Sequence, residues 1–201
     1  MLITSVSETI PIICAICVGK EMLCVSVSLR LKIIKLRSIM QQKKQVIINY
    51  LMSQYSELDA DDRELVDKAM KMTEASYAPY SNFHVGAAVR LENGVIVGGC
   101  NQENAVYPVG LCAERVAVFS SQAQSPNTKI ISLAIAARIT EGEFVSVPVS
   151  PCGSCRQVIL EQEMRFNQPI RIILVGQNGI FIFNSIKDLL PFAFSEESLG
   201  S

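Results

Sequence analysis

Two short segments of the chain carry the side chains best suited to chemistry. The first reads Cys112-Ala113-Glu114, and the second reads Pro151-Cys152-Gly153-Ser154-Cys155. Cysteine thiolates are strong zinc ligands, and three of them would leave one position of a tetrahedral zinc ion free for water, which is typical of catalytic sites. The sequence leaves open whether Cys100 supplies a fourth ligand. The pattern predicts a catalytic zinc centre in which Glu114 lies beside a ligand and can transfer protons.

Both segments lie where a helix is expected to begin, and this placement suits metal binding. A helix N-terminus lowers the pKa of a thiol, which favours the thiolate that binds metal. Three thiolates on one divalent cation leave a net negative charge, so we expect at least one arginine to hydrogen-bond a ligand sulfur. Arg115 and Arg156 directly follow the two motifs. We favour Arg156 over Arg115 for this role, and the alternative is that both are solvated surface residues.

Helical and strand periodicities indicate how the fold would position these segments. Apolar residues at helical spacing from Leu65 predict a helix that Asp59 or Asp61 caps and that residues 78–82 end. Asn-Gly pairs at 93–94 and 178–179 predict two hairpins, whose short turns can join only antiparallel strands. Further helices are expected over 112–122 and 152–166, strands over 85–91, 95–98, 130–137, 170–175 and 180–183, and a short final helix after Ser185. This order predicts an α/β fold, three-layer α/β/α, with a mixed five-stranded sheet and an antiparallel last strand.

The bulk composition favours a small-molecule enzyme over several other classes of protein. The 201 residues carry a formal net charge of -1, whereas a nucleic-acid-binding protein would usually be basic. With 49% hydrophobic and 18% charged residues, the chain has enough apolar material for a core. Its seven cysteines follow no convincing secretory signal, so metal chemistry is expected rather than a disulfide framework. We therefore expect a cytoplasmic protein with a small-molecule substrate and no nucleic-acid or membrane partner.

The N-terminal segment differs from the rest of the chain. Residues 10–19 form an apolar run that Lys20 ends, and the run is shorter than the roughly 18 residues that a membrane span needs. A signal peptide would need a basic residue before that run, whereas Lys20 follows it. Met40 reads like an ordinary protein start. We predict that residues 1–39 are a poorly defined, dispensable extension and that residues 40–201 form the catalytic domain.

Other residues capable of chemistry have simpler explanations. Cys14 and Cys17 also form a Cys-x-x-Cys pair, but they lie in the apolar run, where buried or chance cysteine is expected. His84 is the single histidine, and on its predicted strand it alternates away from the core, so we expect it to face solvent. Cys100 is expected to pack in the core or a loop rather than bind metal.

Longer segments around the two motifs resemble the small, homotetrameric type of zinc-dependent cytidine deaminase. The resemblance covers about residues 58–199 and rests on Tyr80-Ser81-Asn82-Phe83, Val85-Gly86-Ala87-Ala88, Gly99-Cys100-Asn101-Gln102-Glu103-Asn104-Ala105, Cys112-Ala113-Glu114-Arg115, Ser150-Pro151-Cys152-Gly153-Ser154-Cys155-Arg156-Gln157 and Leu189-Leu190-Pro191-Phe192-Ala193-Phe194. It implies hydrolysis of free cytidine and deoxycytidine to uridine and deoxyuridine with release of ammonia, a step of pyrimidine salvage. It further implies one Zn²⁺ per subunit and a homotetramer whose subunits share active sites.

The resemblance also implies a role for each matching residue. Cys112, Cys152 and Cys155 would hold zinc, and Glu114 would carry protons between zinc-bound hydroxide, the ring and the leaving amine. Phe83 would stack on the base, Asn101 and Glu103 would bind the ribose, the backbone of Ala113 would read the base edge, and Tyr107 and Phe194 would reach pockets across subunit contacts. From the residues alone, Asn101 and Glu103 could be turn residues and Phe194 could be plain packing at a helix end.

Three other functions stay open on the sequence. The same scaffold could deaminate an aminonucleoside antibiotic such as blasticidin. A zinc site could merely stabilise the fold, but Glu114 beside a ligand and an open fourth position argue against that. A nucleic-acid editor is disfavoured by the net charge, by the antiparallel last hairpin and by Cys112, where such editors commonly have His.

Overall fold

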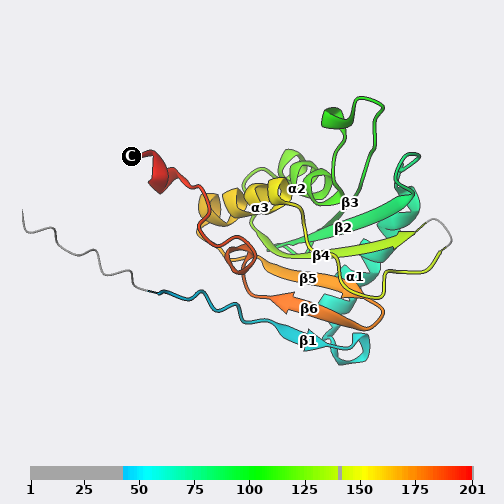
Figure 1. Ribbon diagram of the computed structural model, residues 1–201, viewed down its shortest axis with the longest axis horizontal. Coiled ribbons are helices and arrows are strands. Elements are labelled where there is room, and N and C mark those ends of the chain that lie inside the picture. The colour runs from blue at the N-terminus through cyan, green and yellow to red at the C-terminus, as the bar shows by residue number, and fades with distance from the viewer. Residues whose placement is uncertain (1–42, 140–141, 201) are drawn as a thin grey trace, which may run out of the picture. The chain divides into compact units, whose positions relative to one another are not determined.

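A six-stranded mixed sheet forms the centre of the fold (Figure 1). This computed structural model describes residues 43–139 and 142–200, so the expectations for residues 1–39, Cys14 and Cys17 among them, lie outside the described residues. The strands lie in the order β1-β6-β5-β4-β2-β3, and only β4 and β5 are parallel neighbours. Their bounds are β1 (Leu51–Ser53), β2 (Phe83–Leu91), β3 (Ile96–Cys100), β4 (Ile130–Ile139), β5 (Arg171–Gly176) and β6 (Gly179–Phe183).

Helices cover both faces of this sheet. Helix α1 (Ala60–Met72) packs on one face, and α2 (Ala113–Gln124) and α3 (Gly153–Phe166) pack side by side on the other (Figure 1). Strand β4 supplies both cores, because successive side chains of a strand point to opposite faces. Its Leu133 belongs to the core under α2 and α3, and the next residue, Ala134, belongs to the core under α1. The predicted three-layer α/β/α fold is confirmed.

The sheet has one strand more than the sequence predicted. β1 extends the sheet beyond β6, and its Leu51 pairs with Ile182 in antiparallel register. The ring of Tyr50 packs against those of Phe181 and Phe183, with centroids 5.1 and 5.4 Å apart. The expectation of five strands is therefore wrong, whereas the antiparallel last strand, β6 against β5, is confirmed. The mostly apolar segment 46–52, interrupted by Asn49, could have indicated this strand, although three residues give little alternation to detect.

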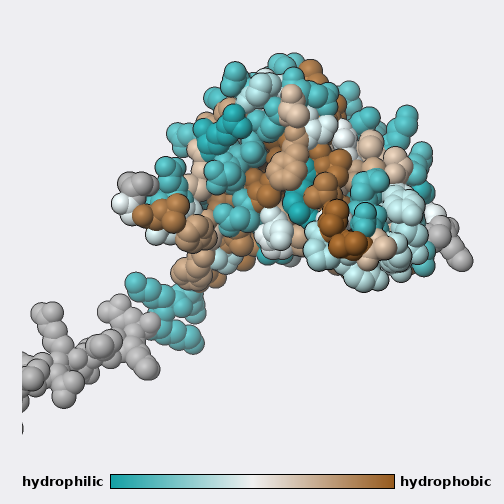
Figure 2. All heavy atoms as spheres, turned by 90° about the horizontal axis from the view of Figure 1, so that it is seen from above, coloured by the Kyte–Doolittle hydropathy of each residue, from teal (hydrophilic) through white to brown (hydrophobic). Residues whose placement is uncertain are grey.

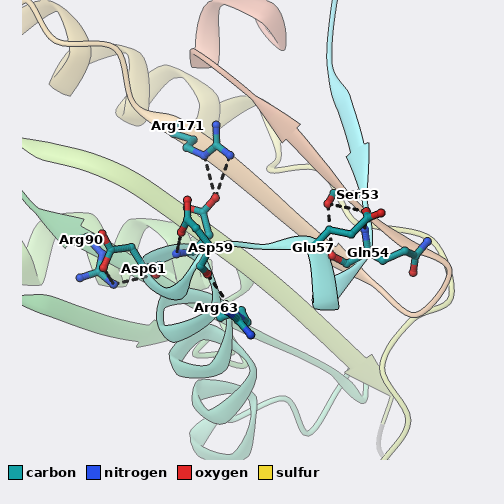
Figure 3. Close-up of polar contacts among 9 residues, drawn as sticks. Ser53, Gln54, Glu57, Asp59, Asp61, Arg63, Arg90 and Arg171 are labelled. Carbon is teal, nitrogen blue, oxygen red and sulfur yellow. Dashed lines mark hydrogen bonds and ion pairs between the residues drawn. The ribbon is translucent and has the colours of Figure 1, made fainter.

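Charged residues fix the first turn of α1 against the sheet (Figure 3). Of the two caps predicted, Asp59 rather than Asp61 is the N-cap, and its carboxylate accepts a hydrogen bond from the backbone N–H of Asp62 at 2.7 Å. The buried carboxylate of Asp62 in turn accepts from Nε and Nη2 of Arg171, at 3.1 and 2.9 Å. Arg171 begins β5, so this pair joins the helix to the centre of the sheet.

A close approach between α2 and β3 sets how near the first turn of α2 lies to the sheet. A Cβ atom added to Gly99 of β3 would lie 2.7 Å from the backbone oxygen of Ala113, at the start of α2. Any larger residue would push the helix away, so glycine is required here for packing rather than for an unusual backbone angle. Because Glu114 follows Ala113, the same contact positions the backbone from which the Glu114 side chain extends.

The smaller predicted features mostly hold. Leu91 N–H donates to O of Val95 across the first hairpin, whose turn has Gly94 at φ +85°. The final helix predicted after Ser185 is a single 3-10 turn, Ile186–Asp188, and the Ser185 hydroxyl accepts from the N–H of Lys187.

Within the described ranges, no helix combines the length and the apolar character that crossing a bilayer requires.

Candidate active site

Three cysteine sulfurs from two distant segments converge on one point. The Sγ atoms of Cys112, Cys152 and Cys155 all lie within 4.8 Å of one another. Cys112 is 3.8 Å from Cys152, and Cys152 is 3.4 Å from Cys155. Zinc–sulfur bonds of about 2.3 Å in a tetrahedral site place the sulfurs about 3.8 Å apart, so these three fit three corners around a zinc ion. Of the residues that the structure describes, no other set of His, Cys, Asp and Glu meets this criterion.

Two helix N-termini point at this cluster. Cys112 is the N-cap of α2, Cys152 is the N-cap of α3, and Cys155 lies in the first turn of α3. The partial positive charge of a helix start favours thiolates. A hydrogen bond from Cys155 lowers the pKa of the Cys112 thiol to about 5, and Arg115 acts in the same direction. The same hydrogen bond raises the pKa of the Cys155 thiol, so of these two cysteines Cys112 is the one that more readily becomes a thiolate.

Glu114 lies beside the cluster in the first turn of α2. Its side chain is buried, with 5% of the residue's surface exposed. Burial raises the pKa of this carboxyl, and the negative charge of Cys112 adds to the effect. A carboxyl whose pKa is moved toward neutrality can both accept and return a proton at working pH, which is what general acid–base catalysis requires.

The two arginines make contacts that reverse the preference drawn from the sequence. Nη2 of Arg115 lies 3.7 Å from Sγ of Cys112. The guanidinium of Arg156 instead donates to backbone carbonyls, from Nε to O of Pro151 at 2.8 Å and from Nη1 to O of Leu189 at 2.5 Å. The preference for Arg156 is wrong, because its side chain joins the ligand loop to the C-terminal segment, whereas Arg115 reaches back one turn to a sulfur.

A cavity of about 490 Å³ opens over the cluster. Cys112, Cys152, Glu114 and Arg115 line it. So do five of the six residues for which a substrate contact is predicted, namely Phe83, Asn101, Glu103, Tyr107 and Ala113. The sixth, Phe194, does not line the cavity of its own chain. The cavity therefore combines a metal-binding floor with both acidic and basic side chains. Its volume suits a ligand of the size of a nucleoside.

Comparison with known proteins agrees with this geometry. A family profile described as "Cytidine and deoxycytidylate deaminase zinc-binding region" matches residues 59–167. The chain belongs to the cytidine deaminase family. A cytidine deaminase of Sporosarcina psychrophila is 41% identical over 140 residues, which cover 70% of this chain and 96% of the relative. The crystal structure of a Burkholderia pseudomallei cytidine deaminase matches with a TM-score of 0.56 at 36% identity, covering 65% and 97% of the two chains.

One relative carries a different substrate in its name. Blasticidin-S deaminase of Bacillus cereus is 30% identical over 141 residues, which cover 69% of this chain and 95% of the relative. Family membership therefore fixes the zinc centre of this cytidine deaminase, with Cys112, Cys152 and Cys155 as the zinc triad.

Asn101 holds the cavity wall of this cytidine deaminase together. Its Oδ1 accepts from Oγ of Ser76 and from the N–H of Val85, at 2.5 and 2.8 Å, and its Nδ2 donates to O of Phe83 at 2.9 Å. A primary amide has two N–H groups, so among the described residues one hydrogen bond to a ligand is still available. Asn101 thus shapes the wall and can also contact substrate.

Glu103 is oriented by the turn before β2. Its Oε2 accepts from the backbone N–H groups of Tyr80 and Ser81, at 2.9 and 3.2 Å, and its Oε1 accepts from Oγ of Ser81 at 2.5 Å. The Ser81 hydroxyl is the largest of the influences that lower the pKa of Glu103. Sequence reasoning assigned no role to Ser81, which also lines the cavity, although it lies within the family-like segment Tyr80-Ser81-Asn82-Phe83.

The remaining candidates lie away from the zinc site. Cys100 is buried, its Sγ donates to O of Ala75 at 3.3 Å, and it is not part of the sulfur cluster, so the packing interpretation is confirmed. His84 is half-buried rather than fully exposed, and it does not line the cavity. Neither residue offers the deaminase a fourth zinc ligand.

Proposed function

We propose that this chain hydrolyses free cytidine and deoxycytidine to uridine and deoxyuridine and releases ammonia. The observation that carries the proposal is the buried Glu114 carboxyl beside the cluster of Cys112, Cys152 and Cys155 at the floor of the cavity. Bound zinc supplies a Lewis acid that brings the pKa of a coordinated water close to neutrality. The cavity then has to hold the base so that its C4 atom faces that floor.

Glu114 moves the protons of the proposed reaction. It takes a proton from the attacking water and delivers it to N3 of the base, which makes C4 electrophilic. It then takes the remaining proton from the hydroxyl group added at C4 and passes it to the amine, so that the C4=O bond forms as the C4–N bond breaks and ammonia leaves. A carboxyl with a raised pKa suits this double role, because it is neither too weak a base nor too weak an acid near neutral pH.

The other cavity residues position the nucleoside in this proposal. Phe83 stacks against the base, and the backbone of Ala113 reads its edge together with Glu114. Asn101 and Glu103 bind the ribose hydroxyl groups. The support is that all these residues line one cavity with Cys112 and Cys152 of the sulfur cluster.

A homotetramer with shared active sites is part of the same proposal. Tyr107 is 74% exposed at the cavity rim, and Phe194 is 61% exposed. The loop with Tyr107 rises at the top of Figure 1 and so faces the viewer in Figure 2, where apolar side chains gather among polar ones. Large exposed apolar side chains are typical of surfaces that another chain covers. Light scattering on the purified chain would report the number of subunits in the assembly. A monomer with full activity would contradict active sites that are shared between subunits.

The central test measures zinc content and cytidine conversion on the same purified sample. One zinc per chain and one ammonia per uridine formed are expected. A chain that binds zinc but releases no ammonia from cytidine would support the alternative in which the metal only stabilises the fold. Parallel assays with blasticidin S and with single-stranded RNA would reveal an antibiotic deaminase or a nucleic-acid editor. Cell fractionation would test the cytoplasmic location that we also propose.

A further inference from the structure

The Ser81 hydroxyl connects two groups that flank the proposed substrate position. It donates to Oε1 of Glu103 at 2.5 Å and accepts from the backbone N–H of Phe83 at 3.1 Å. A serine hydroxyl has one donor hydrogen, so the bond from Phe83 N–H leaves that hydrogen committed to the carboxylate. Ser81 therefore lies between the residue proposed to stack on the base and the one proposed to bind the sugar.

The backbone around Ser81 is shaped to hold the Glu103 carboxylate. Asn82 has a left-handed backbone angle, φ 54°, which turns the chain sharply before β2. The turn lets the N–H groups of Tyr80 and Ser81 both donate to Oε2 of Glu103. These two bonds hold one carboxylate oxygen, and among the described residues the Ser81 hydroxyl alone holds the other.

We propose that Ser81 is a positioning residue for the sugar of the substrate. Its hydroxyl fixes the second oxygen of Glu103, and thereby the plane of the carboxylate, so that the free lone pairs point at the hydroxyl groups of the ribose ring. The inference rests on the proposed function, because it needs a nucleoside in the cavity. Ser81 acts through Glu103 and touches no reacting atom, so it should affect affinity for the sugar and leave proton transfer at Glu114 alone.

Substitution of Ser81 tests this with two ligands. Ser81→Ala should raise KM for cytidine about tenfold, the effect of losing one hydrogen bond to a charged group, and should change kcat by less than about threefold. The inhibition constant of 2′,3′-dideoxycytidine, which lacks both ring hydroxyls, should change by less than about twofold when it competes with cytidine. Ser81→Thr keeps the hydroxyl and should restore KM.

The chain offers a matched control outside the cavity. Oγ of Ser53 also donates to a glutamate, at 3.1 Å from Oε2 of Glu57 (Figure 3). Ser53→Ala removes the same kind of bond at β1, so KM and kcat should stay as in the wild type. Melting temperatures of all variants separate a folding defect from a binding defect. If Ser81→Ala fails to fold, Ser81→Cys replaces the hydroxyl by a weak donor of similar size and should raise KM in the same direction.

The outcomes separate this inference from the function on which it rests. An unchanged KM for cytidine in Ser81→Ala, or equal losses for cytidine and the dideoxy ligand, would overturn the positioning role and leave the deaminase reaction standing. A fall in kcat with an unchanged KM would also overturn it. If the zinc-loaded wild type released no ammonia from cytidine, the proposed function and this inference would fail together.

Discussion

Nη2 of Arg115 lies 3.7 Å from Sγ of Cys112, three residues earlier at the start of α2. Residues three apart on a helix face the same side, so the helix itself brings the cation to the sulfur. The contact keeps the Arg115 side chain beside a thiolate and raises the pKa of the guanidinium. Positive charge next to one of three thiolates reduces the net negative charge of the zinc site, which would otherwise weaken the ion as a Lewis acid.

Arg115→Gln should lower kcat/KM for cytidine by about ten- to a hundredfold, because hydrogen-bond partners of metal ligands have effects of that size. Arg115→Lys keeps the charge and should lose less. Competition with a chelator would show whether zinc affinity falls as well. Equal activity of the wild type and Arg115→Gln would rule out a role for this contact in tuning the metal.

Glu114→Gln should keep zinc and lose turnover. The amide has nearly the same shape but cannot take up or return a proton, and proton transfer by a positioned side chain contributes about 10²–10⁴-fold. Zinc content and ammonia release measured on one sample test both halves of the expectation. Near-normal turnover in this variant would refute the proton-transfer role, and loss of zinc would point to a structural role instead.

Arg156→Gln should loosen the ligand loop. The guanidinium donates to O of Pro151, directly before Cys152, and to O of Leu189 in the C-terminal segment. Loss of these half-buried bonds should reduce the free energy of unfolding by about 1–3 kcal/mol and speed zinc release to a chelator. Gln157→Ala is the control, since the one side-chain hydrogen bond of Gln157 within the described part of the chain goes to O of Phe194 at 2.9 Å. This variant should leave zinc release unchanged. Identical release from Arg156→Gln and the wild type would contradict this link.

The Glu103 carboxylate should contribute stability that depends on pH. Its pKa lies below the ordinary 4.5, because the Ser81 hydroxyl and the Tyr80 N–H favour the charged form, with His84 adding a smaller effect. A lowered folded-state pKa stabilises the fold above the unfolded pKa, and this contribution is lost as pH falls through the folded pKa. The difference in unfolding free energy between the wild type and Glu103→Gln should therefore be constant near neutrality and shrink in acid. Urea titrations at several pH values would show it, and a difference that grows in acid would contradict the assigned direction.

Removal of residues 1–39 should leave folding and activity unchanged, because the predicted domain begins at Met40. Removal through Ser53 should instead lower the melting temperature, since it deletes β1 and the packing of Tyr50 on Phe181 and Phe183. Aromatic pairs contribute about 0.5–1.5 kcal/mol each beyond their buried area, so Tyr50→Ala should reproduce part of the loss. A chain starting at Met40 that failed to fold would show that the boundary prediction is wrong.

The features predicted well from the sequence are those that nearby residues decide. Asp59 caps α1 because its carboxylate meets an N–H three residues on. Gly94 makes a hairpin because its backbone adopts φ +85° at little cost. Strand β1 was missed because three residues are too few to show the alternation of apolar and polar side chains that marks a strand. Its pairing also depends on the edge of β6, which lies far away in the sequence.

The sequence by itself determined which atoms could bind metal and move protons: three thiols and a carboxyl placed at two helix starts. Only the tertiary structure decided which partner each side chain meets. Arg115 rather than Arg156 reaches a sulfur, and Ser81 holds Glu103 across 22 residues of chain. The physical reason is that caps and turns depend on neighbours a few residues away in the chain. These contacts instead depend on how helices and strands pack against one another, which a local sequence pattern does not specify.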